Sequence, residues 1–481
     1  MKWNKLILIT LVAAGFLAVQ SCNKIENFGN LNSNPNATTE PNTAALLTSV
    51  LSGQGGTVWG GYPGATTVDA GFYCQYFTES QYTETCRYQP ASINWDGTYS
   101  GNLYDLQNII LYNNAKPSVA ANNGDNANQI AIARILKAYN YWLLTDCYGD
   151  IPYFDALKGT GAIKYDDQAT IYPDLIKEMT EAVAQFVTPT IAIKGDILFG
   201  GDISKWKKFA NSCRLLMALR MSKKAAAAGQ AAFNAALNDP NGVITSTSDN
   251  ASLSFPGGIF NNPIYAFYNV QQRFDVALSK TVTDVLNANN DARKNAFGTS
   301  TVGFPYGLTR TDAVAFANAN TNWAQCKASA TSALVLVGAA NVYLARAEAA
   351  RLGWTAENAA AMYALGIQRS WEQWGVYDAT ALAAYMALSS VDLSTNADAK
   401  IGLQSWLAWY PNGWQGWSHW RKTNYPALTV APNNNNIPIP RRFPYGTNEP
   451  QLNPVNYAPA AAKYTVGGVP NSQDAKVWFD Q

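Results

Sequence analysis

Hydrophobic residues recur at three- and four-residue spacing over long stretches of the chain, which is the pattern of amphipathic helices. The clearest stretch is 129–147, in which Ile132 and Leu136 belong to one continuous apolar face. Gly149 then offers a left-handed cap, and Pro152 prevents the helix from continuing. Because this apolar face is long, the helix must pack against neighbouring elements.

The same spacing predicts further helices, several of them close enough in sequence to form antiparallel pairs. Their expected bounds are 44–51, 103–111, 171–186, 206–221, 225–237, 335–353, 356–374, 381–388 and 397–410. Small residues at the contacts of such pairs, joined by glycine or proline turns, indicate tetratricopeptide-like packing, although the repeats are irregular. We therefore expect a mostly α protein built from helix pairs, with long loops between some of them.

The inserted loops combine glycine with aromatic residues and follow no single helical or strand period. The longest is 53–101, and 246–274 and 295–323 are similar. Glycine permits tight turns, beside which aromatic rings can stand exposed as flat platforms for a ligand. Packing onto the helical body is the alternative for any single ring. Our candidate ligand-binding residues are Trp59, Tyr73, Tyr82, Trp95, Tyr306 and Trp323.

The composition favours a neutral polar ligand. Charged residues make up 14% of the chain, against about 25% in typical soluble domains, so much of the surface must be uncharged and hydrogen-bonding. Such a surface suits sugars, although an extracellular setting would also explain it. The net charge of +1 gives no indication of the basic surface that nucleic-acid binding requires. A single histidine, His419, argues against histidine triads and multi-histidine metal sites, and we expect no metal or cofactor.

The N-terminus indicates export and anchoring. Two lysines precede an apolar run at 6–19, which is too short to span a bilayer comfortably, and a small residue precedes Cys22. We expect a signal peptide at 1–21 and acylation of Cys22, palmitate included. Residues 22–42 would then be the lipid anchor and tether, and 43–481 a single helical body. An ordinary secretory signal with a chance cysteine is the alternative.

Two aspartates near the end of the helix predicted at 129–147 could take part in catalysis. Asp146 and Asp150 would suit glycoside hydrolysis as acid and base. A helix C-terminus disfavours negative charge, so each is expected to have a positive or N–H partner, and we interpret both as structural. The sequence contains no phosphate-binding loop, dinucleotide fingerprint or EF-hand loop.

The cysteines form no C-x-x-C pair, which argues against a zinc ribbon or a thioredoxin-type site. Cys147 and Cys213 lie within apolar helical patterns and are expected to be free core thiols. Cys74 and Cys86 are close enough in sequence to be paired, but spacing alone leaves their disulfide open.

Several stretches resemble the SusD/RagB family of outer-membrane nutrient-binding lipoproteins. They are 146–153 (DCYGDIPY), 206–212 (WKKFANS), 291–293 (DAR), 303–308 (GFPYGL), 417–426 and 440–457. An Asn-Pro-rich segment after Cys22 is also similar to the family, so the resemblance extends over nearly the whole mature chain.

The resemblance implies that the tetratricopeptide-like helix pairs form the scaffold of a single body with long inserted loops. It also implies a lipoprotein on the outer membrane that faces the cell surface. It would bind a polysaccharide or oligosaccharide without cleaving it, and would cooperate in nutrient uptake with a SusC-like TonB-dependent transporter. A peptide-binding member of the same transporter system is the first alternative. An all-helical glycosidase is the second, and it would need two carboxylates facing each other across a cleft.

Overall fold

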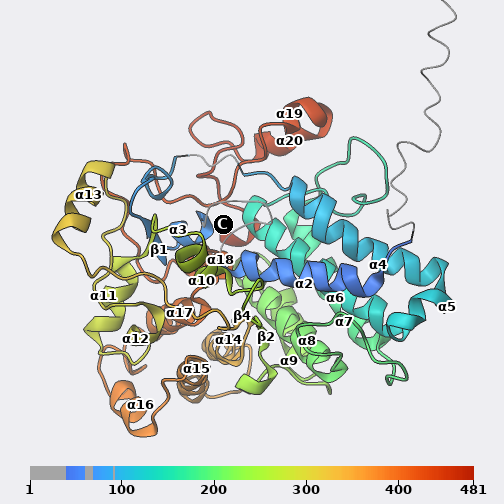
Figure 1. Ribbon diagram of the computed structural model, residues 1–481, viewed down its shortest axis with the longest axis horizontal. Helices are drawn as coiled ribbons and strands as arrows, with labels where there is room; N and C mark the ends of the chain where they lie inside the picture. Colours follow the sequence, from blue (N-terminus) through green and yellow to red (C-terminus); the bar gives the residue numbers. More distant parts are fainter. Residues whose placement is uncertain (1–39, 60–68, 90–92) are drawn as a thin grey trace, which may run out of the picture. The chain divides into compact units, whose positions relative to one another are not determined.

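The computed structural model describes residues 40–59, 69–89 and 93–481. Contacts group residues 42–481 into one compact unit, in which helices predominate, as Figure 1 shows. The predicted mostly α class is therefore confirmed. No helix within the described ranges is both long and apolar enough to cross a membrane.

Helices of eight or more residues make up most of this unit. They are α2 (Thr43–Trp59), α4 (Tyr104–Ala115), α6 (Asn126–Tyr148), α7 (Gln168–Gln185), α8 (Ile203–Arg220), α9 (Ala226–Leu237), α11 (Lys280–Ala288), α13 (Arg310–Ala319), α14 (Ala339–Arg351), α15 (Ala359–Gln373), α16 (Ala379–Met386), α17 (Ala397–Trp409), α18 (Gly413–Thr423) and α20 (Pro454–Lys463). Every helix predicted from the spacing has a counterpart among them.

Shorter helices and strands occupy the connections. The helices are α3 (Asp69–Tyr73), α5 (Pro117–Ala120), α10 (Pro263–Tyr265), α12 (Lys294–Phe297) and α19 (Glu449–Leu452). The strands are β1 (Phe77–Glu79), β2 (Ala251–Leu253), β3 (Val276–Leu278) and β4 (Leu334–Val337), paired antiparallel as β1–β3 and β2–β4. The prediction that 335–353 is wholly helical is wrong at its start, because residues 335–337 belong to β4 and pair with β2.

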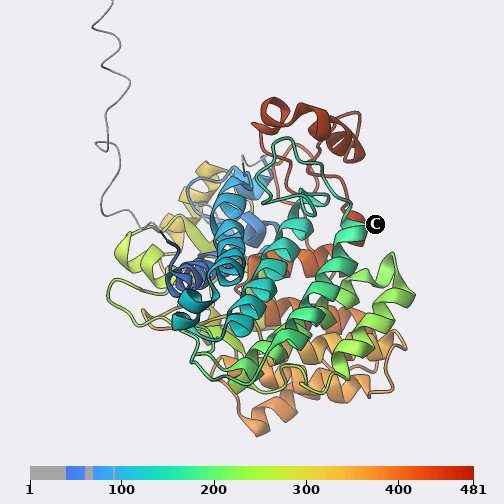
Figure 2. The ribbon, with the colours of Figure 1, turned by 90° about the vertical axis from the view of Figure 1, so that its right-hand side faces the viewer.

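The scaffold is a succession of packed helices. Helices α4, α6, α7, α8 and α9 each contact the next, and Figure 2 shows them as a row. Helix α14 packs against α8, α15 and α17, and α17 in turn packs against α18. The pairs α6–α7, α8–α9 and α14–α15 are the expected antiparallel helix pairs.

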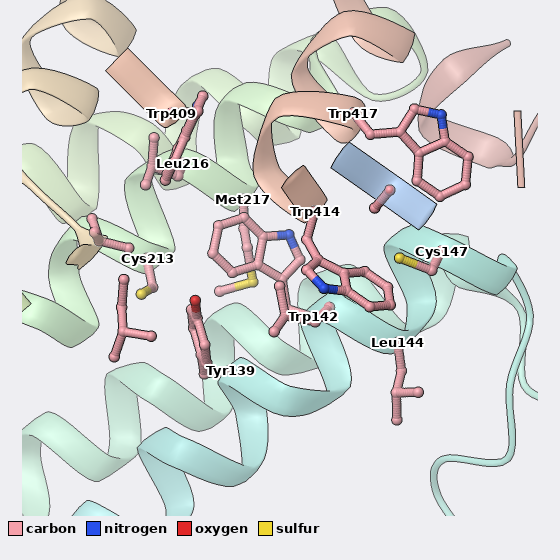
Figure 3. Close-up of a cluster of buried hydrophobic side chains, with 14 of the residues drawn as sticks. Tyr139, Trp142, Leu144, Cys147, Cys213, Leu216, Met217, Trp409, Trp414 and Trp417 are labelled. Atoms are coloured by element: carbon pink, nitrogen blue, oxygen red, sulfur yellow. The ribbon is translucent and has the colours of Figure 1, made fainter. Parts of the chain in front are cut away.

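Helices from distant parts of the chain share one core. Figure 3 shows Trp142 of α6, Met217 of α8 and Trp414 of α18 in the same cluster of buried side chains. The three tryptophans of α18, Trp414, Trp417 and Trp420, are all buried, so their three-residue spacing marks a stripe of core side chains. Cys147 and Cys213 are buried free thiols as predicted, and all five described cysteines are unpaired, so Cys74 and Cys86 form no disulfide.

The C-terminal end of α6 requires hydrogen-bond donors, because the last four carbonyls of a helix have no partner within it. Gly149 follows α6 with φ +83° and ψ −118°, and its N–H donates to Thr145 O (2.8 Å). This backbone has the positive φ that we expected but lies outside the left-handed helical region. A Cβ on Gly149 would lie 2.1 Å from Tyr464 Oη, so both the backbone and the available space require glycine.

The C-terminal segment of the chain supplies donors to the remaining three carbonyls. Arg421 Nη1 donates to Asp146 O (2.6 Å), Phe443 N to Cys147 O (2.8 Å) and Arg442 Nε to Tyr148 O (3.1 Å). Both guanidinium groups are buried, and a cation near a helix C-terminus also interacts favourably with the helix dipole. Burial lowers the pKa of Arg421 to about 10, so it remains charged at neutral pH.

We expect Arg421→Met to lower the free energy of unfolding by about 2–5 kcal/mol, because the buried carbonyl of Asp146 and the partly buried carbonyl of Arg441 lose a donor. Urea denaturation of the variant and the wild type measures this loss. The matched control is Arg351→Met, which breaks a solvent-exposed ion pair with Asp398 and should cost less than about 1 kcal/mol. Equal losses in the two variants would contradict the capping role of Arg421.

Candidate functional site

Two of the predicted ligand-binding residues lie in the core. Tyr73 is 1% exposed, and its ring packs against Trp417 and Phe443 at centroid distances of 5.3 and 5.8 Å. Trp95 is 4% exposed, and its indole N–H donates to Glu449 Oε1 (3.2 Å). The exposure that we expected of both rings is therefore wrong, since each meets other side chains on all sides.

Two further candidates are half-buried. Tyr306 donates its hydroxyl to Phe72 O (2.8 Å). Trp323 packs edge-on against Phe304 at a centroid distance of 5.4 Å, in a small cluster with α13. Each of these rings is partly accessible to solvent, and its contacts with Phe72 or Phe304 fix its position.

Two predicted site residues near the N-terminus, Trp59 and Cys22, lie wholly or partly outside the described part of the chain. Trp59 is the last residue of α2, and its side chain is not among those described. The predicted lipidation site, Cys22, also falls outside the described residues.

Tyr82 is the candidate that stands in solvent, with 61% of its surface exposed. It follows β1, and the pairing of β1 with β3 continues beyond the strands, because Ser80 N donates to Asp275 O (2.8 Å) and Ser80 Oγ donates to Phe274 O (2.7 Å). The segment that ends at Tyr82 thus lies beside the segment that leads into β3. Phe274 adds a second exposed ring there, 41% accessible.

Two arginines border Tyr82. Arg310, the first residue of α13, donates from Nη1 to Gln81 O (3.0 Å). Arg273 forms an ion pair with Asp275 (2.6 Å), which raises its pKa, and Tyr82 makes a smaller contribution in the same direction. We call the surface formed by Gln81, Tyr82, Arg273, Phe274 and Arg310 the Tyr82 face.

The Tyr82 face combines exposed aromatic rings with amide and guanidinium donors on an open surface. The strand β1 and the helix α13 that carry it lie toward the left of Figure 1. Aromatic rings offer an apolar surface to flat, weakly polar ligand faces, and the neighbouring donors can orient hydroxyl groups. Sequence reasoning missed Phe274, although it lies in the aromatic-rich stretch 246–274 that was singled out.

A buried carboxyl lies at the end of β1, the strand that leads to Tyr82. Glu79 of β1 is 7% exposed, and burial raises its pKa to about 7, although its Oε2 accepts a hydrogen bond from Cys86 N (3.0 Å). The group therefore titrates near neutral pH without facing solvent.

The two aspartates considered for hydrolysis have partners within the fold. Asp146 is buried, forms an ion pair with Arg220 and accepts the Tyr172 hydroxyl. Asp150 forms an ion pair with Lys463 (2.6 Å). These contacts support the structural interpretation of both residues. Within the described ranges, no group of three or more His, Cys, Asp or Glu side chains is placed to hold a metal ion.

Comparison with known proteins finds one family model and several similar solved structures. The SusD-like family model described as "Starch-binding associating with outer membrane" matches residues 35–446. A solved structure of a chitin-binding protein is 28% identical, with a TM-score of 0.78 over 91% of this chain and 100% of that one. No curated protein sequence matches significantly.

Two further solved structures share the fold. A SusD homologue from Bacteroides uniformis is 23% identical, with a TM-score of 0.77 over 91% of this chain and 99% of that one. A chitin-binding SusD homologue from Flavobacterium johnsoniae is 21% identical, with a TM-score of 0.76 over 91% of this chain and 98% of that one.

The raised pKa of Glu79 predicts a pH dependence of stability. Its pKa rises from 4.5 in the unfolded chain to about 7 in the fold, so the folded state binds the extra proton and its stability falls as pH rises through this window. Glu79→Gln should therefore gain about 3 kcal/mol on the wild type between pH 4 and pH 8. Urea denaturation of both proteins at the two pH values measures this gain. A constant difference between them would show that the carboxyl has no raised pKa.

Proposed function

The chain belongs to the SusD-like family, and we propose that it is a non-catalytic receptor that binds glycans at the cell surface. In this role it binds polysaccharides or oligosaccharides and delivers them to a SusC-like TonB-dependent transporter of the outer membrane for uptake. The observation that carries the proposal is the Tyr82 face, where the exposed Tyr82 stands beside a second exposed ring, Phe274, and beside Gln81 and Arg310.

An open aromatic face suits a long ligand better than a small one. The C–H faces of sugar rings are apolar and can stack on Tyr82 and Phe274, while hydroxyl groups bond to Gln81 and Arg310. Each sugar contributes little, but a polysaccharide presents many equivalent units to the same face. The low proportion of charged residues, 14%, also fits a neutral glycan.

The relatives suggest which glycans to test. The family description names starch, and two of the similar structures are described as chitin-binding. Both polymers are neutral chains of hexose-type units, so starch and chitin fragments form the first panel. Binding to peptides with no response to glycans would instead favour the peptide-binding alternative.

Anchoring would place the receptor next to its transporter. In this proposal Cys22 carries the acyl chains, and residues 23–42 form the tether between the membrane and the helical body. A tethered receptor works at a high effective concentration beside the transporter, so weak glycan contacts suffice for capture. The family description, which associates its members with the outer membrane, supports this location.

Tyr82→Ala in the mature protein should weaken the binding of long starch or chitin oligosaccharides about fivefold, since stacking on one ring is worth roughly 1 kcal/mol beyond buried area. Calorimetric titration measures the affinity, and release of reducing ends is followed in parallel. The matched control is Tyr377→Ala, which removes a tyrosine that is 43% exposed on the α15–α16 connection and should leave the affinity unchanged.

Either of two results would reject this proposal. Equal affinities of the Tyr82→Ala variant and the wild type would remove the Tyr82 face as the glycan site. Steady release of reducing ends by the wild type would make the protein an enzyme rather than a receptor.

Cys22→Ala should move the protein from the outer-membrane fraction to the soluble fraction of cells, because acyl chains contribute about 0.8 kcal/mol of membrane binding for each buried methylene. Fractionation and labelling with a palmitate analogue measure this. The control is Cys326→Ala, a buried free thiol that should leave both membrane association and labelling intact. Persistent labelling of the Cys22→Ala variant would place the acyl chains elsewhere.

A further inference from the structure

A pocket of about 390 Å³ lies between the β2–β4 sheet, the start of α10 and the C-terminal end of α15. Its volume falls within the range of small-molecule sites, about 300–1,000 Å³. None of the residues that define the Tyr82 face lines this pocket. It is therefore a separate feature, which we call the Gln373 pocket after the residue at its α15 side.

Two asparagines hold the walls of the Gln373 pocket in place. Asn250 Oδ1 accepts a hydrogen bond from Ala339 N (2.8 Å), and Asn262 Oδ1 accepts one from Ile264 N (2.8 Å). Asn262 Nδ2 also donates to Ser332 O (2.8 Å). Because these bonds tie the strand and helix ends together, the pocket is preformed, and a ligand need not order its walls.

Other polar groups in the lining have unused hydrogen-bonding capacity. Among residues 40–59, 69–89 and 93–481, no partner is found for the hydroxyls of Thr247 and Ser252 or for the amide nitrogen of Gln373. Lys327 Nζ donates to one acceptor, Asn295 O (2.9 Å), which leaves further N–H groups. The pocket thus offers both donors and acceptors to a ligand.

The lining contains one basic and one acidic residue, and part of its wall is aromatic. Lys327 and Glu372 bring opposite charges, and Glu372 is already paired with Arg369 (2.7 Å). The rings of Trp374 and Tyr410 lie 5.7 Å apart between centroids and both line the pocket. Most polar groups of the lining are uncharged hydroxyls and amides, and such groups beside aromatic rings match the polar and apolar surfaces of a sugar.

We propose that the Gln373 pocket is a second carbohydrate site, which takes a neutral mono- or disaccharide. It would bind short sugars or the end of a chain, whereas the Tyr82 face takes the extended polymer. Both sites contain residues of the stretch 247–274. Two binding sites on one protein can add avidity for a single glycan.

The test is calorimetric titration of the mature protein with maltose and with chitobiose. Gln373→Ala removes a polar group from the pocket, and Ser252→Phe fills part of it. Each should lower disaccharide affinity about tenfold or more, which corresponds to about 1.4 kcal/mol. Tyr377→Ala, which changes an exposed tyrosine outside both the pocket and the Tyr82 face, is the matched control and should leave disaccharide affinity unchanged.

The outcomes separate this inference from the proposed function. Wild-type disaccharide affinity in Gln373→Ala, at an unchanged melting temperature, would overturn the second site whether or not Ser252→Phe folds. Loss of disaccharide binding in Tyr82→Ala would also overturn it, because one face would then hold all ligands. No heat from the wild type with either disaccharide up to about 10 mM would do the same. Polymer binding that persists in any of these cases leaves the receptor role standing.

Discussion

The end of helix α6 is the constraint on which the rest of the structure depends. Its last carbonyls are buried and would be costly without donors. Two arginines and one backbone N–H from the C-terminal segment supply those donors, about 275–296 residues further along the chain. The C-terminal segment therefore caps the end of α6 in the row of N-terminal helices. The tryptophans of α18 lie in the same core as these helices.

This frame explains how an exposed binding face can stay rigid. Helix α3 packs against α18, and Trp406 donates its indole N–H to Cys74 O (3.0 Å), so the chain is fixed just before β1. The pairing of β1 with β3 then fixes the strand beneath Tyr82, and Arg310 bonds to Gln81 O from α13. A platform held in this way loses little conformational entropy when a glycan binds, which favours capture by a few weak contacts.

Sequence patterns located the helices well, because burying one face of each imposes the spacing that we read. They failed at 335–337, where a short run of apolar residues suits a strand as well as a helix. Interleaved glycine and aromatic residues could not separate exposed Tyr82 from buried Tyr73 and Trp95, since that distinction depends on distant partners. Phe274 escaped notice for the same reason, because β1–β3 pairing joins segments nearly 200 residues apart.

The most direct measurement is a crystal structure of the mature protein with a bound starch or chitin oligosaccharide. We expect a sugar ring stacked on Tyr82, with its hydroxyl groups within hydrogen-bonding distance of Gln81 or Arg310, and an uncleaved chain. An oligosaccharide bound entirely elsewhere, with Tyr82 left in solvent, would show that the Tyr82 face is not the glycan site.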